Sequence, residues 1–245
     1  MTIGGSELSA LLLKNADLKL IEPCIYSVLS DIEVANVYDT QFGNMYDWIA
    51  CNPLYNRVMW GYSIKNFVSF AQTALTSSKT GNVLDLGCGS LAFTAKTYIQ
   101  YSDRPVVLID QSLKMLRLAK SRLMKLIGKV PDNMVFLRAD ARQLPFQQQS
   151  FKTIISLNLL HCLDDTKKLT TGLKNFLSDD GKMYFSTLVK ADRLADRYLK
   201  VLADGGKLVS RGIEDHQALF NQLGMPIKYD VKGNMAFIYY GSNTK

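Results

Sequence analysis

The stretch that most constrains this chain is residues 82–91, with the sequence N-V-L-D-L-G-C-G-S-L. A short apolar run leads to Asp85 and then breaks into a turn that contains Gly87 and Gly89. Such a pattern predicts a strand, a loop and then a helix. The carboxylate would lie at the carboxyl end of the strand, and the glycine turn would let a ligand approach the backbone closely.

A second apolar run, residues 105–109, ends in Asp110. The distance from Gly89 fits one helix and one strand, so this carboxylate is expected at the tip of the neighbouring strand, where it can accept both hydroxyls of a ribose. The two features together predict a nucleoside-binding site. An NAD site is the weaker alternative, because its glycine fingerprint would need glycine where Ala92 stands and has no use for Asp85.

Two further strands are predicted to end in polar residues at the same edge of the sheet. Residues 134–137 are followed by Arg138-Ala139-Asp140-Ala141, and residues 150–157 are followed by Asn158 and His161. Residues 182–188 predict a fifth strand after a turn at 179–181, and residues 227–231 and 235–240 predict a closing hairpin.

These motifs resemble, one after another, those of the class I S-adenosylmethionine-dependent methyltransferases that act on small molecules, and are similar to those of the ubiquinone and menaquinone biosynthesis type. The resemblance implies a Rossmann-like, doubly wound α/β fold with seven mostly parallel strands and an antiparallel carboxyl-terminal edge hairpin. Residues 1–80 read as helical and are expected to form a cap. Residues 81–245 would form the cofactor-binding domain, with a helical insertion at 191–208 that shapes the acceptor side.

The resemblance also implies roles for single residues. Asp110 would hold the ribose, Asp140 and the Ala141 amide would read the adenine, and the glycine turn would fix the methionine part of the cofactor. The full set of expected cofactor-binding residues is Asp85, Gly87, Cys88, Gly89, Asp110, Gln111, Met115, Asp140, Ala141 and Asn158.

Two positions depart from the family pattern. Leu91 stands where many methyltransferases have a third glycine, and leucine does not easily take positive φ, so the turn is expected to differ in detail. Lys152 replaces the acidic residue that usually precedes the fourth strand.

Aromatic residues are dense before the glycine turn. Tyr38-Asp39 and Tyr46-Asp47 resemble the segment that folds over the cofactor in the quinone-type enzymes, which implies a catalytic and substrate-binding lid at Tyr46. Trp60 and Tyr62, together with Tyr198 of the insertion, are further candidates for substrate binding. The alternative is that these rings only pack a core.

His161 follows the fourth strand and is a candidate general base for an acceptor hydroxyl. The alternative is that it only flanks the methionine part of the cofactor. The other histidine, His216, lies in a polar segment and is expected at the surface. No cluster of metal ligands is visible, and the reaction of this family requires none.

Composition limits the class of protein. With 245 residues and 47% hydrophobic content, the chain can bury one core with an appended cap. Four cysteines without C-x-x-C spacing favour a reducing compartment over a zinc or disulfide framework. Neither a signal segment nor a transmembrane run is visible, so a cytoplasmic location is expected.

The net charge of +7 is concentrated in residues 114–129, which hold six cations and no acid. One interpretation is a surface helix whose inward face carries Leu113, Leu116, Leu123, Met124 and Ile127. The other is a patch that binds RNA or an anionic membrane. Residues 157–160 lack the Asn/Asp-Pro-Pro-aromatic motif that grips a flipped base, so methylation of a nucleic-acid base is not expected and nucleic acid is not the favoured partner.

The sequence thus predicts a methyltransferase that moves a methyl group from S-adenosylmethionine to a small, apolar acceptor by direct in-line transfer, with S-adenosylhomocysteine as product. Two alternatives stay open: a protein that binds the cofactor without methylating, and an RNA- or membrane-associated protein that acts through the basic helix. No motif identifies the acceptor, the methylated atom or the oligomeric state.

Overall fold

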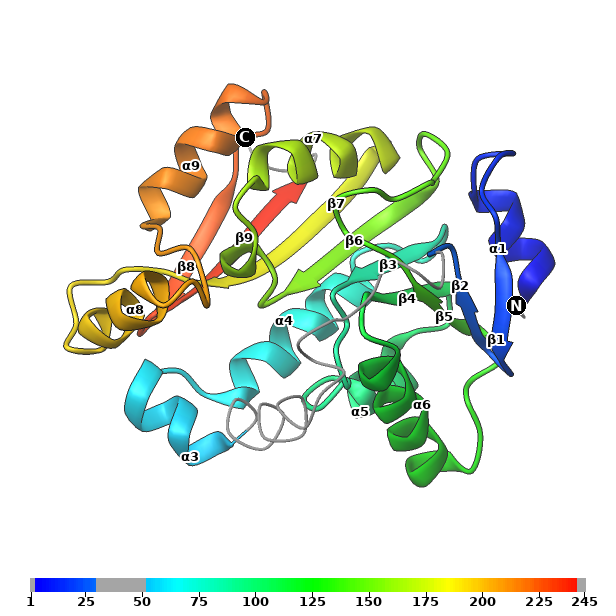
Figure 1. Ribbon diagram of the computed structural model, residues 1–245, viewed down its shortest axis with the longest axis horizontal. Coiled ribbons are helices and arrows are strands. Elements are labelled where there is room, and N and C mark those ends of the chain that lie inside the picture. The colour runs from blue at the N-terminus through cyan, green and yellow to red at the C-terminus, as the bar shows by residue number, and fades with distance from the viewer. Residues whose placement is uncertain (1–2, 30–51, 242–245) are drawn as a thin grey trace.

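One mixed sheet organises the molecule (Figure 1). The computed structural model describes residues 3–29 and 52–241. Within these residues nine strands pair in the order β1-β2-β5-β4-β3-β6-β7-β9-β8. The seven strands from β3 to β9 are those expected, and β1 and β2 extend the sheet beyond the seven-stranded prediction.

The centre of the sheet is parallel and apolar. It consists of β3 (Val83–Leu86), β4 (Val106–Asp110), β5 (Met134–Arg138) and β6 (Phe151–Leu157). Nearly every residue of β3 and β4 is buried, because helices cover both faces of the sheet. This burial explains why these strands read as continuous apolar runs.

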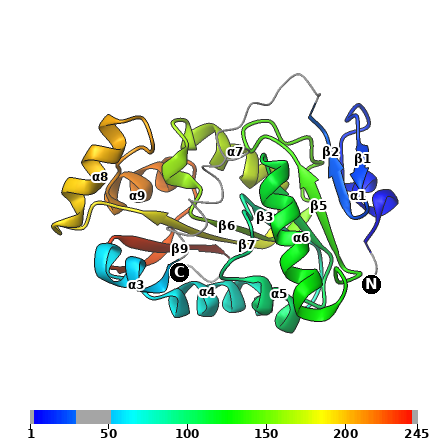
Figure 2. The same ribbon diagram turned by 60° about the horizontal axis from the view of Figure 1, so that its bottom comes forward.

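Two helical layers enclose the sheet (Figures 1 and 2). One face is covered by α4 (Ile64–Thr76), α5 (Ala95–Tyr101) and α6 (Leu113–Ile127), and the other by α1 (Gly5–Leu11), α7 (Thr166–Phe176) and α9 (Ile213–Gln222). Each layer shares an apolar cluster with the strands beneath it. The fold is therefore a three-layer α/β sandwich.

The far side of the sheet is antiparallel, as predicted. Strand β7 (Leu177–Leu188) pairs antiparallel with β9 (Met235–Gly241), which pairs with β8 (Lys228–Lys232). The turn expected at 179–181 is wrong, because β7 runs through it. The register of the pairing between β6 and β7 shifts between Phe151 and Thr153 of β6, opposite the residues where a turn was expected. Gly181 lets the Leu177 side chain pack closely on the backbone there.

The amino-terminal region is not wholly helical, which corrects the sequence prediction. After α1 the chain forms β1 (Lys19–Glu22) and β2 (Ile25–Ser27), an antiparallel hairpin that joins the sheet because β2 lies parallel to β5. Cys24 turns the chain with φ of 69°. The division of the chain at residue 80 stays a prediction, and α4 packs directly on α5, β6 and β7.

A third apolar cluster joins the segment before α4 to the helix after β7. Helix α3 (Pro53–Tyr55) continues into the π-helical turn η2 (Asn56–Trp60), and α8 (Ala195–Asp204) forms within the predicted insertion. Trp60, Phe67, Leu199 and Phe237 are buried together in this cluster.

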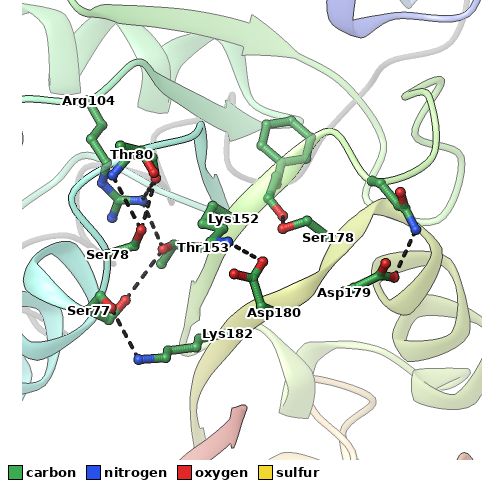
Figure 3. A network of polar contacts seen from close by, with 12 residues as sticks. Ser77, Ser78, Thr80, Arg104, Lys152, Thr153, Ser178, Asp179, Asp180 and Lys182 are labelled. Carbon is green, nitrogen blue, oxygen red and sulfur yellow. Dashed lines mark hydrogen bonds and ion pairs between the residues drawn. The ribbon is translucent and has the colours of Figure 1, made fainter. Parts of the chain in front are cut away.

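A polar network fastens the amino ends of the strands (Figure 3). The buried Arg104 guanidinium donates to the Thr80 carbonyl at 3.2 Å, to Thr153 Oγ1 at 3.1 Å and to the Leu75 carbonyl at 3.0 Å. Lys152 pairs with Asp180 of β7. The lysine that departs from the family pattern thus has a structural partner here.

Helix α6 buries part of the face expected: Leu116 and Leu123 are buried and Leu113 partly so, but Met124 and Ile127 are not. Its buried residues are Met115, Leu116, Ala119 and Leu123, whereas Met124 and Ile127 are more than 40% exposed. Met124 directly follows Leu123 and so points to another side of the helix, whereas Ile127 keeps the helical period but is the last residue of α6.

Candidate functional site

A cavity of about 400 Å³ lies at the carboxyl ends of β3, β4, β5 and β6. Chain order departs from β3 in both directions, with β4 on one side and β6 on the other, so this is the topological switch point at which open α/β sheets bind ligands. Its walls come from the four segments that follow these strands, together with Phe67 of α4.

The glycine turn forms the floor of the cavity. Gly87 and Gly89 take φ of 73° and 55°, and Leu91 also takes φ of 55°. The expectation that leucine would avoid positive φ is therefore wrong. Leu91 is only 2% exposed and packs in the core beneath α5, where its carbonyl accepts hydrogen bonds from the Thr94 and Ala95 amides.

The Asp110 carboxylate stands at the tip of β4 and holds two loops together. Its Oδ2 accepts from the Gly89 amide at 3.0 Å, and its Oδ1 accepts from the Ser112 amide at 2.9 Å. Ser112 in turn caps α6. The structure thus brings the acidic tip and the glycine turn into direct contact.

Asp85 is buried at the end of β3 and also lines the cavity. Its Oδ2 accepts from the Tyr98 hydroxyl at 2.8 Å, whereas Oδ1 has no hydrogen-bond partner within the described residues. Burial raises the pKa of this carboxyl to about 7, against the Tyr98 hydrogen bond and with a further rise from Asp110. A buried acceptor without a donor fits a cationic or hydrogen-bonding ligand group.

Asp140 follows β5 and is tightly paired. The Arg142 side chain donates to both carboxylate oxygens at 2.6–3.1 Å, and the Arg142 amide donates to Oδ1 at 2.9 Å. The Arg142 hydrogen bond is the main reason that the pKa of Asp140 is lowered. Arg142, which the sequence analysis did not single out, also lines the cavity.

The remaining cofactor candidates all border the same space. Met115 is 5% exposed on the first turn of α6, and Asn158 takes φ of 61° just after β6. The cavity brings together all ten predicted residues: Asp85, Gly87, Cys88, Gly89, Asp110, Gln111, Met115, Asp140, Ala141 and Asn158.

His161 does not line this cavity. It lies in η3 (Leu160–Cys162), is 5% exposed, and its Nδ1 accepts from the Leu188 amide at 3.2 Å beside Thr187 Oγ1. Burial lowers its pKa to about 4, with further lowering by His216 and Arg211. The imidazole is held by β7, and this geometry gives no support to the predicted general base.

His216 is not at the surface, which corrects the sequence prediction. It is 1% exposed on α9, and neither ring nitrogen has a hydrogen-bond partner in the described part of the chain. Burial lowers its pKa to about 4, with a further effect of Arg211 that Asp215 opposes. A polar segment in sequence can therefore still bury its single imidazole.

The aromatic candidates divide into three groups. Tyr38 and Tyr46 lie outside the described residues. Trp60 and Tyr62 are each 5% exposed and pack in the third apolar cluster, with the Tyr62 hydroxyl donating to Asn56 Oδ1 at 2.9 Å. Tyr198 lies against Trp60 with ring centroids 5.7 Å apart.

Two aromatic residues that the sequence analysis missed do line the cavity. Phe67 and Phe93 pack against each other with centroids 5.5 Å apart. Phe93 follows the glycine turn closely enough that its place could have been inferred from the loop. Phe67 belongs to α4, and its helical period predicts only burial. Further apolar lining that was missed comes from Leu157, Leu159 and Leu163.

Two other features, a metal-binding cluster and a membrane-spanning helix, are not found among the residues that the structure describes. They contain no group of three or more histidines, cysteines or acids placed to hold a metal ion. The same ranges, 3–29 and 52–241, include no helix with the length and apolar character needed to cross a membrane.

Comparison with known proteins agrees with this geometry. Residues 77–224 match the model of a family described as a methyltransferase domain. The chain is 30% identical over 111 residues to malonyl-[acyl-carrier protein] O-methyltransferase 1 of Ilyobacter polytropus. That match covers 45% of this chain and only 39% of the relative's length.

Solved structures share the fold at low sequence identity. Phosphoethanolamine N-methyltransferase 2 of Haemonchus contortus, in complex with S-adenosyl-L-methionine, superposes with a TM-score of 0.64 at 17% identity, over 82% of this chain and 57% of that one. The YcgJ protein of Bacillus subtilis superposes with a TM-score of 0.54 at 20% identity, over 66% and 70% of the two chains.

Proposed function

Because the chain belongs to the methyltransferase domain family, we propose that it is a class I S-adenosylmethionine-dependent methyltransferase that methylates a small, apolar acceptor at the cavity beyond β3 to β6. The observation that carries this proposal is the convergence of Asp85, Asp110 and the glycine turn on one cavity.

The cofactor fits the polar groups of the cavity. Asp110 would accept the ribose hydroxyls, and the unpartnered Oδ1 of Asp85 would accept from the methionine amino group. The Ala141 amide and Asp140 would bind the adenine, with Met115 against the ring. Since Asp140 is already paired, Arg142 would orient its carboxylate as the adenine amine approaches.

The acceptor side of the cavity is apolar. Phe67, Phe93, Leu157, Leu159 and Leu163 supply hydrocarbon surface that can hold an acceptor and exclude water. When bound, the sulfonium cofactor supplies a methyl group that is already electrophilic. The protein's own work is then to align the acceptor's nucleophilic atom with the bond that breaks, and to keep water away from both.

The alternative through the basic helix receives little support. Arg117 and Lys120 pair with Glu22 of the hairpin, Arg122 donates to Ser90, and Lys129 pairs with Asp132. Because these cations interact with other groups of the protein, less positive charge is available to bind RNA or a membrane.

Calorimetric titration of the purified protein tests the cofactor assignment. We expect S-adenosylmethionine and S-adenosylhomocysteine to bind and NAD not to bind. The variant Asp110→Ala should weaken binding of S-adenosylhomocysteine by about 100-fold, because it removes acceptors for both ribose hydroxyls.

The matched control is Asp103→Ala, which removes an exposed carboxylate just before the same strand. It should bind S-adenosylhomocysteine as the wild type does. Equal affinity of the Asp110→Ala variant and the wild type would refute the ribose assignment. Circular dichroism of both variants separates a lost site from a lost fold.

A further inference from the structure

A second cavity lies between η2 and α8, away from the residues assigned to the cofactor. It has a volume of about 580 Å³ and shares no lining residue with the first cavity. Its floor and walls are apolar apart from two arginines and one phenol. The lining residues are Val58, Met59, Arg193, Leu194, Ala195, Arg197 and Tyr198.

The charge of this cavity is uncompensated. Neither the Arg193 nor the Arg197 guanidinium has a hydrogen bond or an ion pair with any described residue, and no acid is among the lining residues. The acid on the first turn of α8, Asp196, points elsewhere, because it accepts from the Ala191 amide and from Asn234 Nδ2. Two cations with free donors at an apolar wall suit an anion.

A neighbouring phenol adds no negative charge. Burial is the main reason that the pKa of Tyr55 is raised to about 12, and the nearby Tyr198 hydroxyl raises it further. The Tyr55 ring therefore stays neutral near pH 7 and contributes only apolar surface and a hydrogen-bonding group to this region.

Apolar side chains remain open to solvent around the cavity. Val58 and Leu194, which line it, are 74% and 83% exposed. Leu54 of α3 and Val201 of α8, on neighbouring parts of the chain, are 71% and 64% exposed. Exposed apolar surface beside two arginines matches a molecule that has both an apolar part and an anionic end.

One aromatic cluster links the two cavities. Tyr198 of the second cavity packs on Trp60, which is buried in the same cluster as Phe67. Phe67 packs on Phe93, and both line the first cavity. The two cavities therefore border one buried aromatic cluster.

We propose that the second cavity binds a small amphiphile with a carboxylate head, whose anionic end interacts with Arg193 and Arg197. Its alkyl part would lie against Val58 and Leu194, which line the same cavity. This site is separate from the cofactor cavity of the proposed function.

Titration with decanoate tests the inference, with 1-decanol as the neutral comparison. We expect the wild type to bind decanoate and to bind decanol at least tenfold more weakly. The double variant Arg193→Gln with Arg197→Gln should raise the Kd for decanoate about tenfold and leave that for decanol unchanged. The matched control is Lys200→Gln with Lys207→Gln, which removes two exposed cations in and just after α8, outside the cavity lining, and should bind decanoate normally.

The site of binding has its own readout. The chain has two tryptophans, so a Trp48→Phe variant reports on Trp60 alone, and decanoate should change its fluorescence through the contact with Tyr198. Equal binding of decanoate and decanol, or equal loss in both double variants, would overturn the inference.

Titration with S-adenosylhomocysteine keeps the two proposals apart. The arginine double variant should bind it as the wild type does, since neither arginine lines the first cavity. No binding of S-adenosylhomocysteine by the wild type would overturn the proposed function alone. Cofactor binding without arginine-dependent binding of decanoate would overturn this inference alone.

Discussion

Single residues at the cofactor cavity combine a structural and a binding role. Asp110 joins the glycine turn to the cap of α6 before any ligand is considered, and Asp85 is anchored by Tyr98 through one oxygen only. Both carboxylates are therefore held in fixed positions, and the Oδ1 atom of Asp85 is left to accept from a ligand. Such preorganisation lowers the entropic cost of binding a ligand.

Leu91 shows that a family glycine can be replaced when the side chain gains enough from burial. A leucine in the left-handed region costs roughly 1–2 kcal/mol. Complete burial of its side chain contributes about 2–3 kcal/mol, which offsets the strain. The presence of leucine is thus compatible with an intact turn and is no sign of a lost cofactor site.

This balance predicts an unusual order of stabilities. Leu91→Ala loses the buried side chain and keeps the strain, whereas Leu91→Gly loses the side chain and relieves the strain. We expect both variants to be less stable than the wild type, and Leu91→Gly to be more stable than Leu91→Ala by about 1 kcal/mol in urea unfolding.

The control is Leu116, which is equally buried but lies in the interior of α6. There the alanine variant should be the more stable of the pair by about 1 kcal/mol, because glycine is unfavourable within a helix. If alanine were also the better residue at position 91, the strain argument would be wrong.

At the scale of elements, the sequence predicted the parts of the fold that have strong patterns. The buried strands β3 to β6 are continuous apolar runs that end in polar residues, and the cofactor cavity follows from where they end. The hairpin of β1 and β2 was missed because β1 is largely exposed and shows no apolar alternation. Its strand form depends on pairing with β5 through β2, which no local pattern records.

The acceptor side was the least predictable part of the site. Trp60 and Tyr62 are aromatic and close in sequence to the cofactor domain, yet the structure buries them in a cluster behind the cavity. Phe67 reaches the cavity because α4 packs against α5, the helix that follows the glycine turn, and no local pattern in the sequence records this tertiary contact. Spacing in the sequence distinguishes buried from exposed positions but not which buried ring borders a cavity.

The turn between β8 and β9 is hydrogen-bonded to both η2 and α8. The Asn234 amide donates to the Trp60 carbonyl at 2.8 Å, and Asn234 Nδ2 donates to the Val189 carbonyl at 3.0 Å and to Asp196. Gly233 makes this possible, since a Cβ there would lie 2.1 Å from the Trp60 carbonyl oxygen. The turn therefore fixes the two elements that border the second cavity.

We predict that Gly233→Ala destabilises the protein by about 3 kcal/mol in urea unfolding, because it adds a backbone clash to the strain of φ at 60°. Gly128→Ala is the matched control. Its φ is 79°, but a Cβ there would meet nothing within 4 Å. This variant should therefore lose only about 1 kcal/mol of stability, from backbone strain alone. Equal losses of stability in the two variants would show that the close contact of Gly233 with the Trp60 carbonyl does not restrict this turn.

At the scale of the whole molecule, buried titratable groups make stability depend on pH. His161 and His216 have pKa values of about 4 in the folded protein, below the ordinary value of 6.5. Between pH 6.5 and 4 the unfolded chain binds protons that the folded protein excludes, so the free energy of unfolding falls as pH falls. Asp85 has the opposite effect, because its pKa is raised from 3.8 to about 7 and the folded protein binds the extra proton in this window.

The two histidines together change the free energy of unfolding more than the one aspartate does. The cofactor-free wild type should therefore lose stability from pH 6.5 to 4.5. In His216→Leu the terms of His161 and Asp85, each on the order of 3 kcal/mol and of opposite sign, nearly cancel. We expect this variant to be at least as stable as the wild type at pH 8, since an unpartnered buried imidazole is replaced by an apolar group, and to show a shallower loss of stability down to pH 4.5. Urea unfolding at a series of pH values measures both effects.

The variant His216→Gln separates the two causes. It should show the same shallow pH dependence but lower stability at pH 8, because it still buries polar atoms. If both variants kept the wild-type slope, the titration of His216 would not be a source of the acid sensitivity.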